Sequence, residues 1–424
     1  MKKIKYTHTD DVVFYEKLKN GLEVFMYPSD KAKSFYITYS VKFGSIHTKF
    51  KVDGGKPTVI PYGTAHFLEH QMFQMEDGDA FSKFASLGSN ANAFTTYNDT
   101  TYEVMSNSNF KENLELLIDV VNNPYFQKSS VDNERGIISE EIKMYDDNPS
   151  ARSAYGLEYN ININDNHKYL ISGTIDDINK INKDILYKTY DTFYRSDNMF
   201  IIITGKFKPL EALGIIKERM KKYPNKDNHV VDVICEKEPV KVFKSMEEVK
   251  MDVALPKIRL AYKMPRKSFK DFDDLMLKIY LRLILNINFG ITSDLLENMI
   301  NQRLINYDIY AKSEVRKDYI YISFTLESEY KDEVIELIKE TLRSMKISKE
   351  DMDRYKKVWL SNYIMHFDDI IEVNEDILDD VLNSGKINDN VIDIINDLNV
   401  EDVTKIIDAF TLDNECLYII NKDN

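Results

Sequence analysis

The chain repeats one stretch of its sequence 220 residues further on. Residues 110–121, FKENLELLIDVV, align with residues 330–341, YKDEVIELIKET. Apolar residues three and four positions apart recur in both and predict amphipathic helices. A strand-like alternating segment precedes each helix, and a second helix is expected after each, starting near Val131 and near Lys349. The stretch is therefore one part of a repeated helix–strand unit.

A second pair of segments follows in the same order. Residues 184–205, DILYKTYDTFYRSDNMFIIITG, resemble residues 402–422, DVTKIIDAFTLDNECLYIINK, with the offset reduced to 217. Two matches in one order favour a duplicated α+β unit over a chance likeness of helix–strand pairs. We expect an N-terminal half over 1–221, a charged linker or an edge strand plus linker over 222–250, and a C-terminal half of the same fold over 251–424.

Within the first half, one segment alternates with a period of two. Phe35, Ile37, Tyr39, Val41 and Phe43 are apolar at every second position. This pattern predicts a strand with one buried face.

Composition sets outer limits on function. The 424 residues include 56 Lys+Arg and 70 Asp+Glu, a formal net charge of −14, and 43% are hydrophobic, which excludes a mostly disordered chain. An acidic chain without a basic stripe is expected to bind nucleic acid poorly. No apolar run approaches the roughly 20 residues of a membrane span. The start, MKKIKYTHTD, lacks an apolar core, and two cysteines cannot build a disulfide framework, so we expect a cytoplasmic protein.

The sharpest chemical feature is the segment GTAHFLEH at residues 63–70. On a helix, His66 and His70 share a face and can offer two imidazole nitrogens to one metal ion. Glu69 lies beside both and can reach water at that ion, the arrangement that metal-assisted hydrolysis needs. The order H-x-x-E-H inverts the H-E-x-x-H motif. The alternative is a surface helix that holds two histidines by chance.

A third ligand is expected on the helix after Val131, where Asp132 or Asn133 can cap the helix and Pro149 can close it. Glu134 and Glu141 are seven residues apart and share a face, whereas Glu140 is displaced by roughly 100°. Glu141 can be a ligand and Glu134 can orient one.

These motifs together resemble the insulinase/pitrilysin family of zinc peptidases, the inverzincins. The resemblance rests on H-x-x-E-H, the N-A-F-T segment at 92–95, and E-R-x-x-x-x-E-E-I-x-M-Y-x-D-x-P at 134–149. It is closest to the processing-peptidase-like bacterial subunits and spans essentially the whole chain. It implies an α+β fold of two duplicated α/β-sandwich halves, each a mostly antiparallel sheet with helices packed on it, joined by a linker.

The resemblance also assigns roles. It implies one Zn2+ per chain, held by His66, His70 and Glu141, with Glu69 as general base and Glu134 as the carboxylate behind the ligands. The segment 89–96 matches the family's active-site edge strand, to which an extended peptide can add through main-chain bonds. Asn92 matches an Asn that touches substrate backbone, Ala93 supplies a carbonyl, and Phe94 completes the strand site.

The second half departs from the pattern. At the 220 offset, His66 and His70 become Asn286 and Gly290, and Glu141 becomes Ser361, so the chain carries one site. The family completes that site with an Arg and a Tyr seven residues apart. Here Tyr307 takes the Tyr position, but Ile300 takes the Arg position. Either Arg303 substitutes for the missing Arg, or a partner chain supplies the Arg/Tyr pair.

The sequence thus predicts a zinc metalloendopeptidase for peptides or unfolded segments, with Tyr307 or its partner counterpart donating to the oxyanion. It is expected to act as the zinc subunit of a hetero- or homodimer with a related chain. The alternative is a zinc-containing peptide-binding or structural subunit with little turnover of its own.

Overall fold

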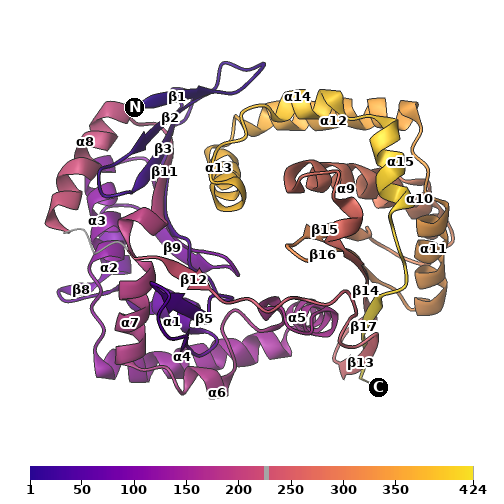
Figure 1. The fold of residues 1–424 in the computed structure, drawn as a ribbon, viewed down its shortest axis with the longest axis horizontal. Helices are drawn as coiled ribbons and strands as arrows, with labels where there is room; N and C mark the ends of the chain where they lie inside the picture. Colours follow the sequence, from indigo (N-terminus) through magenta and orange to yellow (C-terminus); the bar gives the residue numbers. More distant parts are fainter. Residues whose placement is uncertain (224–228, 424) are drawn as a thin grey trace. The chain divides into compact units, whose positions relative to one another are not determined.

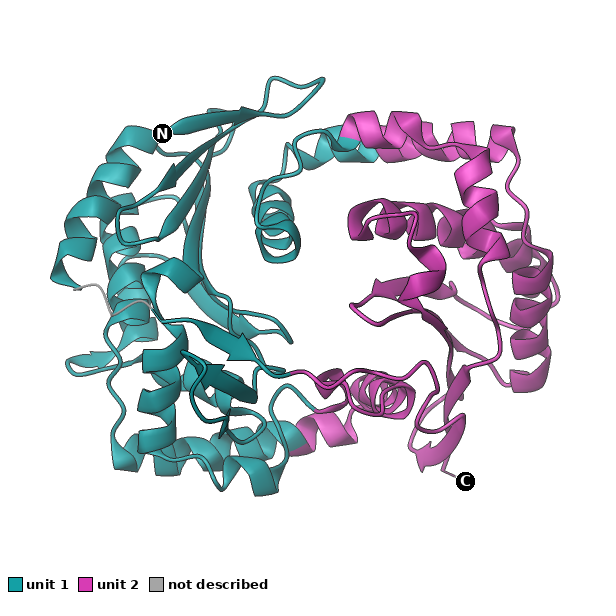
Figure 2. Ribbon diagram, in the orientation of Figure 1, with its two compact units in different colours: residues 1–142, 170–234, 362–391 teal, residues 143–169, 235–361, 392–424 magenta. Residues whose placement is uncertain are grey.

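The computed structural model describes residues 1–223 and 229–423, and they form two compact units (Figure 2). Unit 1 consists of Met1–Ile142, Leu170–Ile234 and Asn362–Val391. Unit 2 consists of Lys143–Tyr169, Cys235–Ser361 and Ile392–Asn424. Each unit takes one segment from the opposite half of the sequence, so the units differ from the linear halves 1–221 and 251–424.

Unit 1 is built on a seven-stranded sheet in the order β1-β2-β3-β11-β4-β10-β9 (Figure 1). Only β3 and β11 run parallel; all other neighbours are antiparallel. The strands are β1 Lys2–Lys5, β2 Val12–Lys17, β3 Glu23–Pro28, β4 Phe35–Val41, β9 Asn90–Thr95, β10 Thr100–Ser106 and β11 Met199–Gly205. Strand β9 is one edge of this sheet.

Helices cover both faces of the sheet in unit 1. One face packs against the helices that follow the strands: α1 Thr64–Met72, α2 Ala80–Ser86, α3 Phe110–Asn122, α4 Lys128–Asp147, α7 Lys183–Phe193 and α8 Pro209–Arg219. The other face packs against α13 Ile370–Ser384. Short elements complete the unit: β5 Lys49–Val52, β6 Thr58–Val59, β7 Gln74–Met75, β8 Gly78–Asp79, α6 Ile175–Ile178 and β12 Val231–Val233.

Unit 2 is built on a five-stranded sheet in the order β13-β17-β14-β16-β15. Its strands are β13 Met246–Met251, β14 Lys257–Pro265, β15 Tyr310–Val315, β16 Tyr319–Glu327 and β17 Glu415–Lys422. Its helices are α5 Pro149–Ile161, α9 Asp274–Phe289, α10 Asp294–Asn301, α11 Lys331–Ser344, α12 Lys349–His366, α14 Val391–Asp397 and α15 Val400–Asp408. The last turn of α12 belongs to unit 1.

The two sheets repeat one topology. The order β3-β11-β4-β10-β9 in unit 1 becomes β13-β17-β14-β16-β15 in unit 2, with one parallel pair followed by three antiparallel pairs in both. Helices α3 and α11 follow equivalent strands, and α7 and α15 precede equivalent strands. The duplication predicted from residues 110–121 and 330–341 is therefore confirmed, as is the mixed fold of two halves.

The halves exchange a helix. Helix α5 comes from the N-terminal half and packs on β14 and β17, whereas its counterpart α13 comes from the C-terminal half and packs on β4 and β11. This exchange corrects the expectation of one buried face for the strand near residue 35. Every residue of β4 is buried, because α13 covers its second face, where Thr38 donates to the Asn374 amide oxygen at 2.7 Å.

One helix boundary also differs from expectation. Helix α4 begins at Lys128, so neither Asp132 nor Asn133 caps it, although Pro149 does start the next helix. The stretch 222–250 holds the short strand β12 and nearly all of β13. Between those strands, the buried Glu238 carboxylate accepts from the backbone N–H groups of Ile163, Asn164 and Asp165 and anchors the segment to unit 2.

Contrary to the expectation from the sequence, the stretch Asp274–Asn301 is long and apolar enough to cross a membrane by length and composition alone. In the structure it forms two helices, of 16 and 8 residues, separated at Gly290. Eight side chains of α9 are buried within unit 2. Packing in the core of that unit accounts for the apolar composition.

Candidate metal centre

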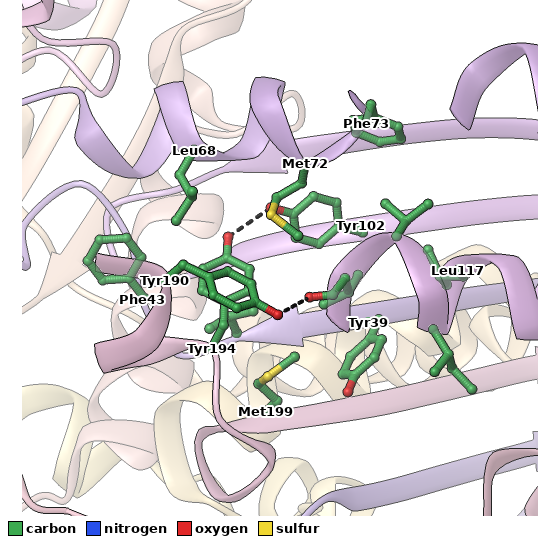
Figure 3. Packing of buried hydrophobic residues seen from close by; sticks show 14 of the residues in the cluster. Tyr39, Phe43, Leu68, Met72, Phe73, Tyr102, Leu117, Tyr190, Tyr194 and Met199 are labelled. Atoms are coloured by element: carbon green, nitrogen blue, oxygen red, sulfur yellow. Dashed lines mark hydrogen bonds between the residues drawn. The ribbon is translucent and has the colours of Figure 1, made fainter. Parts of the chain in front are cut away.

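Helix α1 carries the predicted motif and has two distinct faces. Phe67, Leu68 and Met72 are fully buried in the core of unit 1. Figure 3 shows Met72 beside Tyr102, and Leu68 and Met72 above Tyr190 and Tyr194. The Tyr102 and Tyr194 hydroxyls are 2.8 Å apart. This packing fixes the rotation of α1 about its axis, so its histidines are held on the opposite side.

A glycine sets where α1 begins. Gly63 is the residue before the helix and has a φ of 80°. A Cβ added there would lie 2.2 Å from the carbonyl oxygen of Ser172. Only glycine combines a left-handed backbone with this close approach, so the first residue of the GTAHFLEH motif positions the helix against the 172–173 loop.

His66, His70 and Glu141 come together as predicted. The Nε2 atoms of His66 and His70 are 3.3 Å apart, and the Glu141 carboxylate oxygens lie 3.5 Å from His66 Nε2 and 3.6 Å from His70 Nε2. Among the described residues, this is the one group of three or more His, Cys, Asp or Glu side chains close enough to hold a metal ion.

The donor set fits zinc. Nitrogen and oxygen ligands about 2.0–2.2 Å from a tetrahedral zinc ion lie roughly 3.3–3.6 Å from one another, which matches the three separations. Two imidazoles and one carboxylate leave the fourth position open, as catalytic zinc sites do. His66 Nδ1 is buried without a hydrogen-bond partner, so its Nε2 is the atom available to an ion.

Glu134 orients His70 from behind. Its Oε1 lies 2.9 Å from His70 Nδ1, so the Nδ1–H donates to the carboxylate and Nε2 is directed to the cluster. Burial lowers the pKa of His70, but the hydrogen bond to Glu134 and the charges of Glu69, Glu134 and Glu141 outweigh it and raise that pKa above its ordinary value. Protons therefore compete with a metal ion for this site.

Two residues beside this pair escaped prediction from the sequence. Gln71 is fully buried, and its amide donates to Glu134 Oε2 at 3.2 Å. Ser130 in turn donates to Gln71 Oε1 at 2.9 Å. Gln71 directly follows the motif, but a lone glutamine on a helix carries no signal of its partner 63 residues away.

Glu69 is 93% buried yet has a polar partner. The Thr95 hydroxyl donates to Glu69 Oε2 at 2.7 Å. Thr95 is the last residue of β9, the edge strand beside α1. Thr95 lies in the segment expected to bind substrate, but no role was predicted for it.

The predicted strand residues do form this edge strand. Asn92 is exposed. Ala93 packs against the core on the face covered by α1 and α3, and Phe94 packs toward the face covered by α13. The outer edge of β9 pairs with no other strand among the described residues. Its backbone groups can pair with an extended peptide, and the contacts of Asn92, Ala93 and Phe94 with substrate stay a prediction.

Tyr307 belongs to unit 2, in the loop between α10 and β15, with 74% of its surface exposed. Ile300 is half-exposed near the end of α10. Arg303 has a φ of 58°, and its N–H and that of Leu304 bond back to α10 carbonyls, so Arg303 terminates the helix. The assignment of Tyr307 and the substitution by Arg303 stay predictions.

The comparisons with known proteins agree with this arrangement. Residues 31–170 match the model described as insulinase, peptidase family M16, and residues 180–358 match the model described as the peptidase M16 inactive domain. A protein of Bacillus subtilis named uncharacterized zinc protease YmfH is 37% identical over 309 residues, which are 72% of this chain and 72% of that protein. The chain belongs to peptidase family M16. The cluster at 66, 70 and 141 lies inside the segment that matches the insulinase model.

Solved structures show the same M16 fold. An M16-like protein from Alicyclobacillus acidocaldarius matches 99% of this chain and 100% of its own, with a TM-score of 0.91 and 23% identity. The periplasmic protease PqqL from Escherichia coli matches 99% of this chain but 48% of its own, with a TM-score of 0.75 and 19% identity. This M16 chain therefore corresponds in length to about half of PqqL.

Proposed function

We propose that this chain is a zinc-dependent endopeptidase that cleaves peptides or unfolded segments bound as an added strand on β9. The observation that carries the proposal is the cluster of His66, His70 and Glu141 with Glu69 beside it, next to an unpaired sheet edge. Membership of a family whose relative YmfH is named a zinc protease supports it.

The chain's own residues account for the chemistry. When bound, a zinc ion polarises a peptide carbonyl and lowers the pKa of water toward about 7. Glu69 takes a proton from the attacking water and passes it to the leaving amine. Glu134 keeps His70 in the tautomer that binds metal, and the free edge of β9 aligns the peptide by main-chain hydrogen bonds.

The test is the pair of variants Glu69→Gln and Glu76→Gln. Glu76 is an exposed residue between β7 and β8 and serves as the control. We expect about one zinc ion per chain in the wild type and both variants, measured by elemental analysis. Turnover of a quenched fluorescent peptide should disappear only in Glu69→Gln. Full activity of that variant would remove Glu69 as the base.

We further propose that the chain is the zinc subunit of a two-subunit chambered protease, in which a related cytoplasmic chain supplies an Arg/Tyr pair. Ile300 at the expected Arg position and the half-length match to PqqL support this. Turnover should be weak alone and rise on adding the partner chain. Hydrolysis at about ten per second by the purified chain alone would exclude the partner.

The same assay separates the second candidate, a zinc-containing peptide-binding or structural subunit, which Ile300 favours. Zinc and peptide binding without turnover, alone and with each related chain of the source organism, would support that candidate.

A further inference from the structure

The proposed base is held by the strand that would bind the substrate. Within the described part of the chain, Thr95 is the residue that hydrogen-bonds the Glu69 carboxylate, through Oε2. The second oxygen, Oε1, is left to receive a proton. A carboxylate with one oxygen fixed has a defined direction for the other, and a general base must lie about 2.6–3.2 Å from the heavy atom that carries the proton it takes.

The position of the Thr95 hydroxyl follows from the strand register. Side chains alternate between the two faces of β9. Ala91, Ala93 and Thr95 lie on the face covered by α1, and Asn90, Asn92 and Phe94 lie on the other face. Thr95 pairs with Thr100 across the hairpin. A shift of one residue in this register would turn the hydroxyl away from Glu69.

The turn after Thr95 is rigidly built. The Thr96 N–H donates to the Asp99 carbonyl oxygen at 2.8 Å, and the Asn98 and Asp99 N–H groups donate to the Thr96 hydroxyl. The Thr101 hydroxyl donates to Asp99 Oδ2 at 2.8 Å. Asp99 is almost fully buried. These bonds hold the end of β9 in place, so the Thr95 hydroxyl is presented to Glu69 by a pre-organised turn.

We infer that Thr95 is a positioning residue, which fixes the orientation of Glu69 and couples it to the strand that binds the peptide. The inference rests on the proposed role of Glu69 as base. A peptide added to the outer edge of β9 and the base that Thr95 holds would then both be positioned by β9. Alignment of the substrate and of the base therefore depends on the same strand position.

Kinetics of two variants test this inference. Thr95→Val keeps the β-branched shape and removes the hydroxyl, whereas Thr95→Ser keeps the hydroxyl. We expect Thr95→Val to lower kcat by about 10- to 100-fold, with KM within about two-fold, zinc content unchanged and the melting temperature little changed. Thr95→Ser should recover most of kcat. A Thr95→Val variant with wild-type kcat would overturn the inference, and so would equal losses in both variants.

A second measurement is independent of turnover. In crystal structures of the zinc-loaded proteins, Glu69 should adopt one conformer in the wild type and Thr95→Ser, and a different or divided one in Thr95→Val. An unmoved Glu69 would overturn the inference even if the wild type proves inactive. An inactive wild type with a displaced Glu69 in Thr95→Val would instead contradict the proposed function and keep the positioning role.

Discussion

At the scale of single residues, the geometry of the candidate metal centre depends on side chains that are not among its three candidate ligands. Gln71 holds Glu134, and Glu134 holds His70. Each hydrogen bond removes rotational freedom from the next group, so the imidazole is already oriented before an ion arrives. Groups behind metal ligands typically contribute 10- to 100-fold to metal affinity or activity.

The variant Gln71→Met tests this chain of contacts. It keeps the length of the side chain and removes the amide, so Glu134 Oε2 loses a buried donor. We expect the zinc dissociation constant to rise about 10-fold, measured by competition with a chromogenic chelator. Gln74→Met, at a half-buried position in β7, is the matched control and should leave affinity unchanged. Equal affinities for Gln71→Met and wild type would show that Glu134 needs no such support.

The residues of the candidate metal centre were visible in the sequence because spacing on a helix fixes which side chains share a face. His66 with His70, and Glu134 with Glu141, needed only the helical period. Thr95 and Gln71 were not visible, because their partners lie 26 and 63 residues away. A hydroxyl or an amide has many possible partners, and only the packing of α1 against β9 and α4 selects one.

At the scale of elements, helix α5 approaches the sheet of unit 2 so closely at one position that only a glycine fits there. Gly156 lies in the middle of α5, where a Cβ would approach the ring of Tyr418 on β17 to 2.2 Å. Alanine normally stabilises a helix relative to glycine by roughly 0.5–1 kcal/mol. Here the ring would have to move, and it is almost fully buried.

We therefore expect Gly156→Ala to destabilise unit 2 by about 1–3 kcal/mol, measured by urea unfolding. Gly214→Ala is the matched control, because Gly214 lies in the middle of α8 and an added Cβ there would meet open space. That control should raise stability by up to about 1 kcal/mol. A stabilised Gly156→Ala would mean that α5 can shift away from β17 at little cost.

Element types followed from periodicity, but faces and boundaries did not. The repeated apolar spacing of α3 and α11 located both helices, and alternation located β4. Alternation cannot show that a second layer covers the polar positions of β4, since Thr38 is satisfied by Asn374, 336 residues away. The start of α4 was misplaced because a polar residue inside a helix resembles a cap when its surroundings are unknown.

At the scale of the whole molecule, the exchange of α5 and α13 makes the linear halves interdependent. Residues 1–221 alone would lack α13 and expose the apolar face formed by residues such as Phe25, Tyr27 and Phe200. They would also carry α5 without β14 and β17. An uncovered apolar sheet face favours aggregation.

We expect the fragment 1–221 to be insoluble or unfolded when expressed alone. Co-expression with the fragment 222–424 should restore a soluble complex that binds zinc, judged by size-exclusion chromatography and elemental analysis. Its proposed peptidase activity would then be a further readout. A stable, monomeric fragment 1–221 with native circular dichroism would show that α13 contributes little to the fold of unit 1.

The sequence by itself determined the duplication, the mixed α+β class, and the positions of His66, Glu69, His70, Glu134 and Glu141 on two helices. Each depends on short-range geometry, in which the helical and strand periods decide what shares a face. Only the tertiary structure decided which sheet each helix covers, and that Gln71 and Thr95 support the centre. An amphipathic helix must bury its apolar stripe, but its sequence does not say against what, so that choice belongs to the packing of the complete chain.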